Sequence, residues 1–280
     1  MKTKILCLYL LAVFFCSCAK LNTHIPLKEN ENFFIIKTSD HQRISFNDFI
    51  DDISKSDIIL LGEKHDNMHH RNSEIMIIKH LEDNLNKSNQ KFNVAFEMFS
   101  NSNQSIINKA KIQKESINEK KLQKALNWDK TWNWEIYKDL ISLVFYSNAN
   151  IIGANLSKDE IAQIYQGVEP LNGILSTQNK IKQEIKKIIS ISHKIRDEKI
   201  LEKLTEIQQF KDRRMADVLV NSKNKILLVA GMFHVSKKIG IPLHIKDFKS
   251  KKKISVVVFN IDPEDIEYQD GDYIFIFKSN

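Results

Sequence analysis

Cysteine is nearly absent from this chain, and glycine and proline are scarce. The 280 residues include three cysteines, namely Cys7, Cys16 and Cys18, so the chain from Ala19 onward has no thiol. This excludes a disulfide, a thiolate nucleophile and a cysteine-ligated metal from that part of the chain. With 7 glycines and 4 prolines there is no glycine-rich linker, and no internal repeat is present. Stability must therefore come from a hydrophobic core, which roughly 260 residues can supply.

The first residues have the layout of an export signal. Two lysines precede an apolar run over residues 5–15, which is shorter than the roughly 20 residues of a spanning helix. Phe15-Cys16-Ser17-Cys18 is an irregular lipobox, so we predict a signal peptide over residues 1–17, acylation of Cys18 and a tether over residues 18–32. The lipid would hold the protein in the cell envelope, on the periplasmic face of the outer membrane. The alternative is a secreted protein cut near Ala19 without a lipid.

The chain carries an excess of positive charge, with a formal net charge of +7. An exported protein is not expected to have a nucleic-acid partner. The excess lysine favours anionic ligands or anionic lipid surfaces, or it is simply a solvated surface.

Five apolar runs predict buried strands, at residues 57–61, 92–96, 150–154, 225–230 and 255–261. Each run is continuous rather than alternating, which suits a strand covered on both faces, and periodic segments between the runs suit helices. The pattern predicts an α/β fold with a large, mostly parallel sheet flanked by helices, in which residues 33–37 and 273–278 add edge strands.

The segment between the third and fourth predicted strands has no strand signal. Ser157, Ser176 and Asp197 stand where helix N-caps are expected. We therefore predict a small all-helical subdomain over residues 156–221, inserted in a sheet domain made of residues 33–155 and 222–280.

Polar residues collect where four of the predicted strands end. Glu63 and His65 follow the first strand, Glu97 the second, Asn155 the third and His234 the fourth. Because the carboxyl ends of parallel strands meet at one edge of a sheet, where α/β folds bind ligands, these side chains are expected to converge. We call these five residues the polar rim.

The polar rim allows two interpretations. A single Glu-x-His is often plain surface, whereas carboxylates and histidines from separate strands suit a metal or acid/base site. Glu63, His65, Glu97 and His234 are thus the candidate residues of a metal-dependent hydrolase with a metal-activated water, although a His-Glu-x-x-His spacing is missing.

Neighbouring histidines and tryptophans are given structural roles. His69 and His70 begin a helix, and they are expected to be solvated residues or N-terminal helix residues and not ligands. Trp128, Trp132 and Trp134 lie within seven residues, which suits a packed aromatic cap over the sheet edge, although a flat hydrophobic ligand could use the same wall.

Seven segments together resemble one protein family. In chain order they are LLGEKHDNMHH, AFEMF, WDKTWNWEIY, GANLSKDEIAQIY, SISH, QQFKDRRMADVL and AGMFHVSKKIGIPLHI. So many ordered matches are far more specific than Gly-Glu-x-His alone. The sequence resembles the ChaN-like haem-binding lipoproteins of the Tiki-like superfamily, which also includes proteins regarded as metal-dependent hydrolases.

The resemblance implies a role in haem and iron uptake rather than catalysis. It implies a large parallel sheet with a small helical domain, and a homodimer that forms around two stacked haems. A tyrosine of each subunit would ligate the haem iron, and a histidine and a lysine of the partner subunit would hold the propionates. An outer-membrane haem receptor is the expected partner.

The resemblance assigns the iron ligand and the propionate-binding residues to particular positions in these segments. Tyr165 is the first choice for the iron ligand because it ends the first helix of the inserted subdomain, and Tyr137 is the second. His193, in SISH, and Lys237, after AGMFHV, are chosen for the propionates, with His234 as the rival histidine. A phenolate favours ferric haem, and the lack of Cys-x-x-Cys-His excludes covalent attachment, so the haem would be held reversibly.

Overall fold

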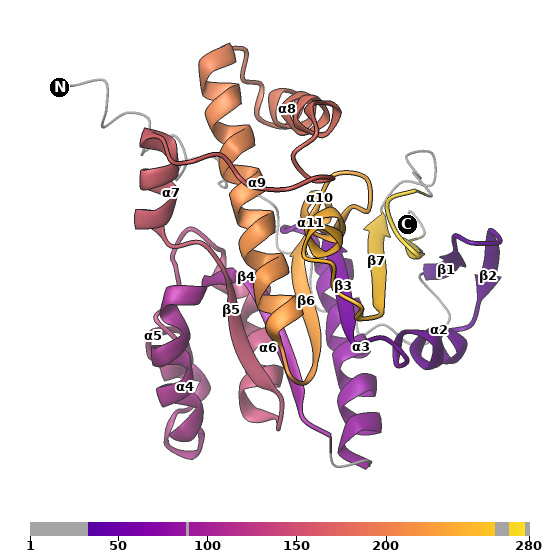
Figure 1. Cartoon of the computed structure of the whole chain (residues 1–280). Coiled ribbons are helices and arrows are strands. Elements are labelled where there is room, and N and C mark those ends of the chain that lie inside the picture. The colour runs from indigo at the N-terminus through magenta and orange to yellow at the C-terminus, as the bar shows by residue number, and fades with distance from the viewer. Residues whose placement is uncertain (1–32, 88–89, 261–268, 278–280) are drawn as a thin grey trace.

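The computed structural model describes residues 33–87, 90–260 and 269–277 (Figure 1). The expected signal peptide, the acylation site Cys18 and the tether up to residue 32 lie outside the described residues. Among the helices described, none combines the length and the apolar character needed to cross a membrane.

Eight strands form one sheet in the order β2-β1-β8-β7-β3-β6-β4-β5. The strands are β1 Phe33–Lys37, β2 Gln42–Ile44, β3 Ile58–Glu63, β4 Phe92–Ser100, β5 Asn150–Asn155, β6 Lys225–Gly231, β7 Ile254–Asn260 and β8 Tyr273–Phe277. The five pairs from β8–β7 to β4–β5 are parallel, whereas β1 pairs antiparallel with β2 and β8. The predicted α/β class with a mostly parallel sheet is confirmed.

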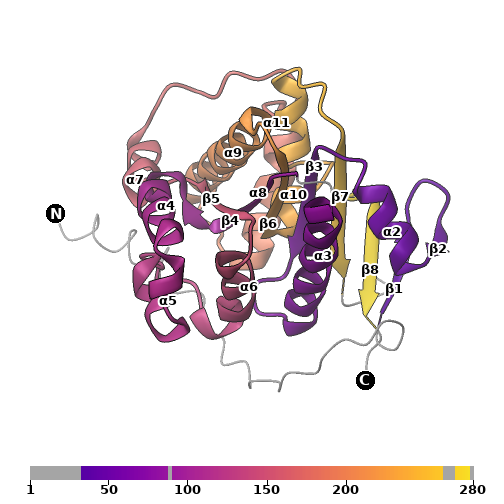
Figure 2. The same ribbon diagram turned by 90° about the horizontal axis from the view of Figure 1, so that it is seen from below.

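Two separate helix layers cover the two faces of the sheet (Figure 2), and alternate side chains of the central strands pack against one layer or the other. In β3, Ile59 and Leu61 belong to the core on one face, and Ile58 and Leu60 belong to the core on the other. Because both faces are covered, the strand is apolar throughout. The first layer contains α2 Phe46–Ile53, α3 Met68–Lys87, α4 Gln104–Ile112, α5 Glu119–Ala125 and α6 Trp134–Tyr146, with 3-10 turns at Asn101–Asn103 and Lys114–Ser116. The second layer contains α9 Glu198–Asn221, α10 Met232–Val235 and α11 Ile241–Asp247.

The remaining helices, α7 Lys158–Gln166 and α8 Asn179–His193, lie beyond the carboxyl ends of the strands (Figure 1). Ser157 caps α7 in a capping box with Glu160, and Asp197 caps α9, as predicted.

The prediction that Ser176 caps a helix is wrong. The helix α8 begins after Gln178, and the hydroxyl of the buried Ser176 instead donates to Asp247 Oδ2 at 2.6 Å. A capping residue was expected because serine is common at N-caps, but here a tertiary carboxylate on α11 takes up the hydroxyl.

The helix α9 joins the region beyond the sheet to the sheet itself. Its later residues Met215, Ala216 and Leu219 belong to the core beneath the strands, whereas Leu201, near its start, packs with Ile185 of α8. The division into a sheet domain and an inserted helical subdomain at residues 156–221 stays a prediction. The long helix places residues of its middle section next to the carboxyl ends of the strands.

Candidate functional site

The polar rim assembles around Glu97, at the carboxyl ends of the central strands. The Oε1 atom of Glu97 lies 3.1 Å from Nε2 of His234, and its Oε2 accepts a hydrogen bond from the backbone N–H of Gly231 at 2.8 Å. Nε2 of His65 lies 4.0 Å from the same Oε2, and the side-chain amide of Asn155 donates to the backbone oxygen of Glu97 at 2.9 Å. The side chains that the sequence predicted to converge therefore do lie together.

Glu63 connects the rim to a network inside the protein. Its Oε1 accepts hydrogen bonds from the Tyr137 hydroxyl at 2.7 Å and from Nδ1 of His65 at 2.9 Å. Its Oε2 pairs with Arg71, which is fully buried and also pairs with Glu74. The guanidinium carbon of Arg71 lies 4.1 Å from the ring centroid of Tyr137. Glu63 is thus held by three donors, as a buried carboxylate requires.

The two rim histidines have opposite protonation behaviour. Burial lowers the pKa of His65, which favours the neutral ring. Burial also opposes the charged form of His234, but the carboxylates of Glu97 and Asp212 outweigh it and raise the pKa of His234 to about 10. In turn, burial disfavours the ionised form of Glu97, yet the charge of His234 holds the pKa of Glu97 below its usual range.

Stability is expected to depend on the charge of His234. Because its pKa is raised to about 10 in the folded protein, the charged ring stabilises the fold fully below the unfolded value of about 6.5, and this contribution is lost as the pH rises toward 10. Urea unfolding of the wild type and of His234→Gln should therefore show the largest difference in free energy of unfolding near pH 6 and a much smaller one near pH 10. A difference that stays constant over this range contradicts a charged His234.

The rim carboxylates are engaged by protein groups. Glu97 contacts His234 and a backbone N–H, and Glu63 contacts Arg71. Within residues 33–87, 90–260 and 269–277, no group of three or more histidine, cysteine, aspartate or glutamate side chains is arranged to hold a metal ion. The geometry of the rim is that of a buried ion-pair network.

His70 is a residue at the start of a helix, as predicted, but it is fully buried and not solvated. It lies at the start of α3, where its Nδ1 accepts a hydrogen bond from the backbone N–H of Lys64 at 2.9 Å and its ring stacks on Phe277. Burial lowers the pKa of His70 to about 3, so the ring is neutral. Lys64, in the loop after β3, contacts this ring through its backbone N–H. The sequence pattern of a helix start does not reveal that contact. His69 is half-buried.

The two candidate tyrosines differ in access. Tyr137 is 1% exposed, and its hydroxyl donates a hydrogen bond to Glu63. Burial raises the pKa of Tyr137 well above the usual range. Tyr165 is half-buried in α7 and packs against a buried cluster of Leu156, Ile164 and Ile207. Of the two phenols, that of Tyr165 is the one nearer to solvent.

The tryptophans line the core on the first helix layer. Trp128 is buried, and Trp132 and Trp134 pack against the same core. The ring of Trp132 meets that of His65 edge-on, with 4.9 Å between their centroids. The prediction of a packed aromatic cap is confirmed.

The two residues predicted to bind propionates lie apart from each other. His193 is the exposed last residue of α8, and burial together with the charge of Lys211 lowers its pKa. Lys237 follows α10 and forms an ion pair with Asp272, just before β8. Four strands separate β8 from β5, the strand that leads to α7 and Tyr165. Because Lys237 pairs with Asp272 beside β8, it lies toward the other edge of the sheet from Tyr165.

Sequence reasoning missed three residues that complete the rim. Arg71 neutralises Glu63, Asp212 pairs with Nδ1 of His234, and the Gln208 side chain lies 3.0 Å from the same nitrogen. Arg71 and Asp212 are charged residues on the buried faces of amphipathic helices, at positions where the helical period calls for apolar side chains. That break in the pattern was the available signal.

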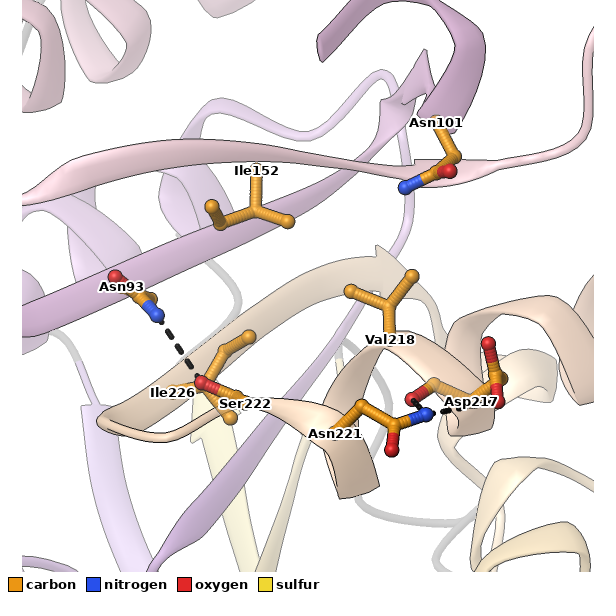
Figure 3. Close-up of a pocket in the computed structure, with 8 residues that line it drawn as sticks. All are labelled: Asn93, Asn101, Ile152, Asp217, Val218, Asn221, Ser222 and Ile226. Atoms are coloured by element: carbon orange, nitrogen blue, oxygen red, sulfur yellow. Dashed lines mark hydrogen bonds between the residues drawn. The ribbon is translucent and has the colours of Figure 1, made fainter. Parts of the chain in front are cut away.

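A surface pocket of about 280 Å³ lies away from the rim, between the last turns of α9 and the first residues of β4 and β6 (Figure 3). Its polar side chains bond to one another: Asn93 donates to the Ser222 hydroxyl at 3.0 Å, and Asn221 donates to Asp217 at 2.9 Å. These mutual contacts leave the pocket without a convergent set of free polar groups.

Comparison with known proteins points to one family. A family model described as haem-binding uptake, Tiki superfamily, ChaN matches residues 49–245. The chain is also similar to the solved structure of ChaN of Campylobacter jejuni, described by its cofacial heme binding. That likeness has 50% identity and a TM-score of 0.88 and covers 91% of this chain and 100% of that one.

Other likenesses are much weaker. A Bacillus cereus protein shares 12% identity over 78% of this chain and 70% of its own, with a TM-score of 0.47. An erythromycin esterase shares 11% identity over 88% of this chain and 83% of its own, with a TM-score of 0.45. Neither carries an argument about function. No curated protein matches the chain.

Proposed function

Because the chain belongs to the ChaN family of haem-binding uptake proteins, we propose that it is a lipid-anchored carrier that binds haem for uptake and does not catalyse a reaction. The observation that carries this proposal is the 50% identity over the whole length of a haem-binding relative. The proposed ligand arrangement is a stacked haem pair at the interface of a homodimer.

The residues beyond the strand ends fit haem, which is a flat apolar ring with two carboxylates and an iron. Large apolar side chains are exposed there, with Val168 37%, Ile191 68% and Phe233 45% accessible. Tyr165 can supply a hard oxygen ligand, and such a ligand favours ferric iron and reversible binding. His193 can supply a charge-assisted hydrogen bond to a carboxylate.

We assign the iron ligand to Tyr165 rather than to Tyr137. To bind an external iron, Tyr137 would have to break the hydrogen bond from its hydroxyl to Glu63 and the contact of its ring with the Arg71 guanidinium. Leaving a buried carboxylate without one of its donors costs about 1–3 kcal/mol. Tyr165 is half-buried on a helix outside the sheet, so iron ligation by its phenol leaves the Glu63 network in place.

We assign Lys237 to the haem that Tyr165 of the other subunit ligates. The position of Lys237 toward the opposite edge of the sheet supports a role across a dimer interface. To contact a propionate, Lys237 would exchange its ion pair with Asp272, which retains a hydrogen bond from the backbone N–H of Val256.

Lys237→Ala is expected to weaken haem-driven dimer formation, because a propionate loses a charged donor from the second subunit. Sedimentation velocity with and without haem measures the monomer and dimer populations. Lys55→Ala is the matched control, since Lys55 pairs with Asp52 and is 69% exposed on its side chain. A Lys237→Ala variant that dimerises with haem as well as the wild type contradicts the assignment.

Cys18→Ala is expected to move the protein from the membrane fraction to the soluble fraction, because a lipid at Cys18 is the proposed anchor. Fractionation of cells that express the full chain, followed by immunodetection, provides the measurement. Retention of the variant in the membrane fraction contradicts lipidation at this residue. With the anchor in the outer membrane, a haem receptor of that membrane is the proposed partner.

A metal-dependent hydrolase at Glu63, His65, Glu97 and His234 is the alternative that the experiments must separate from haem transport. Zinc or manganese bound to the purified protein, and lost in His65→Ala, would favour the hydrolase. The existing partners of Glu63 and Glu97 support the structural interpretation of these residues.

A further inference from the structure

The segments that lead into the amino ends of the central strands are strongly basic. Residues 54–57, 87–91, 222–225 and 249–253 lead into β3, β4, β6 and β7, and together they contain nine lysines and one acidic residue, Asp57. The whole chain, by comparison, has 42 lysines and arginines against 35 acidic residues. The composition of the chain therefore does not account for the charge of these four segments, which we call the basic end.

Contacts between the segments join the basic end into one surface. Nζ of Lys225 donates to the backbone oxygen of Ser54 at 2.9 Å, and Nζ of Lys252 donates to a backbone oxygen in the last turn of α9 at 3.2 Å. The Asp57 carboxylate accepts a hydrogen bond from the backbone N–H of Lys253 at 2.8 Å. The seven lysines other than Lys225 and Lys252 are exposed, so the surface presents several positive charges to solvent.

Carboxylates border the basic end without cancelling its charge. Asp52 pairs with two lysines, the buried Glu82 accepts two backbone N–H groups just before β5, and Asp217 accepts a hydrogen bond from the Asn221 side chain. Three further acidic residues close to these segments in the chain are exposed, namely Asp51, Asp83 and Glu115. The seven exposed lysines outnumber them, which suits a partner of negative charge.

An exposed apolar side chain lies at the same end of the sheet, beside β5. Ile112, the last residue of α4, is 85% exposed. Its neighbour Lys111 donates to the backbone oxygen of Ser147, just before β5, at 2.9 Å, so α4 ends near the amino ends of the strands. Tyr146, the last residue of α6, is 37% exposed. Apolar and aromatic side chains among lysines are typical of surfaces that enter the head-group region of an anionic bilayer.

The basic end and Ile112 are spread too widely to hold a small anion. They extend across five neighbouring strands, in the order β7-β3-β6-β4-β5, which is roughly 20 Å at the usual spacing of strands. They lie at the opposite end of the sheet from α7 and α8 (Figure 1). A broad, positively charged surface with an exposed isoleucine fits an extended anionic surface.

The proposed tether is long enough for this end to meet a bilayer. Phe33 pairs with Phe277, the last residue of β8, so it lies at the carboxyl ends of the parallel strands. Residues 18–32 span at most roughly 50 Å when extended, whereas the seven residues of β7 span about 23 Å. A lipid at Cys18 can therefore lie in a bilayer beneath the amino ends.

We propose that the basic end and Ile112 form a contact surface for an anionic phospholipid bilayer in the haem-free monomer. The contact turns the carboxyl ends of the strands, with Tyr165, away from the lipid, where haem and a second subunit can approach. This inference rests on the lipid anchor of the proposed function. It concerns residues outside the proposed haem site, so it can fail while haem binding stands.

Co-sedimentation of haem-free residues 19–280 with vesicles tests the surface without the anchor, using phosphatidylcholine with and without phosphatidylglycerol. A variant with Lys249, Lys251 and Lys253 changed to glutamine removes three exposed charges from the basic end. The matched control changes Lys180, Lys182 and Lys187, which are exposed on α8 at the other end of the molecule, so both variants have the same net charge. Because a lysine near an anionic surface contributes about a five-fold change in partitioning, we expect the first variant to bind on the order of 100-fold more weakly.

Support requires that the wild type binds only the vesicles with phosphatidylglycerol, that high salt weakens this binding and that the α8 variant binds as the wild type does. Ile112→Ser should bind several-fold more weakly at unchanged charge. Equal losses in the two triple variants, or no binding by the wild type, overturn the surface. Binding to polyglutamate but not to vesicles assigns the surface to an acidic protein and overturns the bilayer.

Two further measurements separate this inference from the proposed function. Haem titration of the same samples tests the carrier function, and a wild type that binds vesicles but no haem contradicts that function alone. A high-salt wash releases the contact of the basic end but not a lipid anchor. Full-length protein that a salt wash removes from membranes therefore contradicts the anchor and leaves the contact surface supported.

Discussion

Tyr165→Phe is expected to abolish the tyrosinate charge-transfer band of the protein loaded with ferric haem, and to lower its haem affinity. The substitution removes only the phenolic oxygen, which is the proposed iron ligand, and keeps the ring that packs against Leu156, Ile164 and Ile207. The fold should therefore persist, which circular dichroism can verify. Absorption and resonance Raman spectra of the haem complex provide the measurement.

Tyr137→Phe is the matched control for this experiment. Its hydroxyl donates to Glu63 inside the protein, so the variant should keep the tyrosinate band and lose about 1–3 kcal/mol of stability, because a buried carboxylate loses a donor. A band that survives in Tyr165→Phe and disappears in Tyr137→Phe would reverse the two assignments.

Arg71→Met is expected to cost about 3–5 kcal/mol of unfolding free energy, the range for removing one partner of a buried ion pair. Arg71 is fully buried and pairs with both Glu63 and Glu74. Burial already raises the pKa of Glu74 to about 7 with Arg71 in place, so without Arg71 the Glu74 carboxyl takes up a proton and Glu63 is left as a buried carboxylate without its cation. Urea denaturation near pH 7.5 measures the loss.

A second substitution tests the cause of that loss. Adding Glu63→Gln to Arg71→Met removes the stranded charge, so the double variant should lose less than the sum of the two single variants. Lys55→Met, which breaks a pair with a largely exposed lysine, should leave stability nearly unchanged. A loss below about 1 kcal/mol in Arg71→Met contradicts a stabilising role of the buried pair.

The sequence predicted the sheet well because buried parallel strands leave a strong local pattern. Residues 58–61 and 226–230 are apolar at every position since helices cover both faces of the sheet. The ends of the strands were less certain, because β3 and β4 continue through the polar residues Glu63 and Glu97. Hydropathy marks such residues as loop, whereas Glu63 still pairs with Gly231 of β6 and β4 continues past Glu97 through an irregularity between Phe96 and Ser100.

The site was only partly predictable, for a physical reason. Residues at or just after the predicted carboxyl ends of strands, such as Glu97 and His234, were found by the topology rule alone. Arg71 and Asp212 come from helices whose rotation about their own axes is set by tertiary packing, so their contact with the rim depends on the whole fold. The buried state of His70 was missed for the same reason.

Haem titration of residues 19–280, followed by absorption spectroscopy and sedimentation of the same samples, tests the central claim most directly. The account predicts saturable binding, a high-spin ferric spectrum with a tyrosinate band and a shift from monomer to dimer as haem is added. A protein that takes up no haem, and instead carries a divalent metal that is lost in His65→Ala, would contradict it.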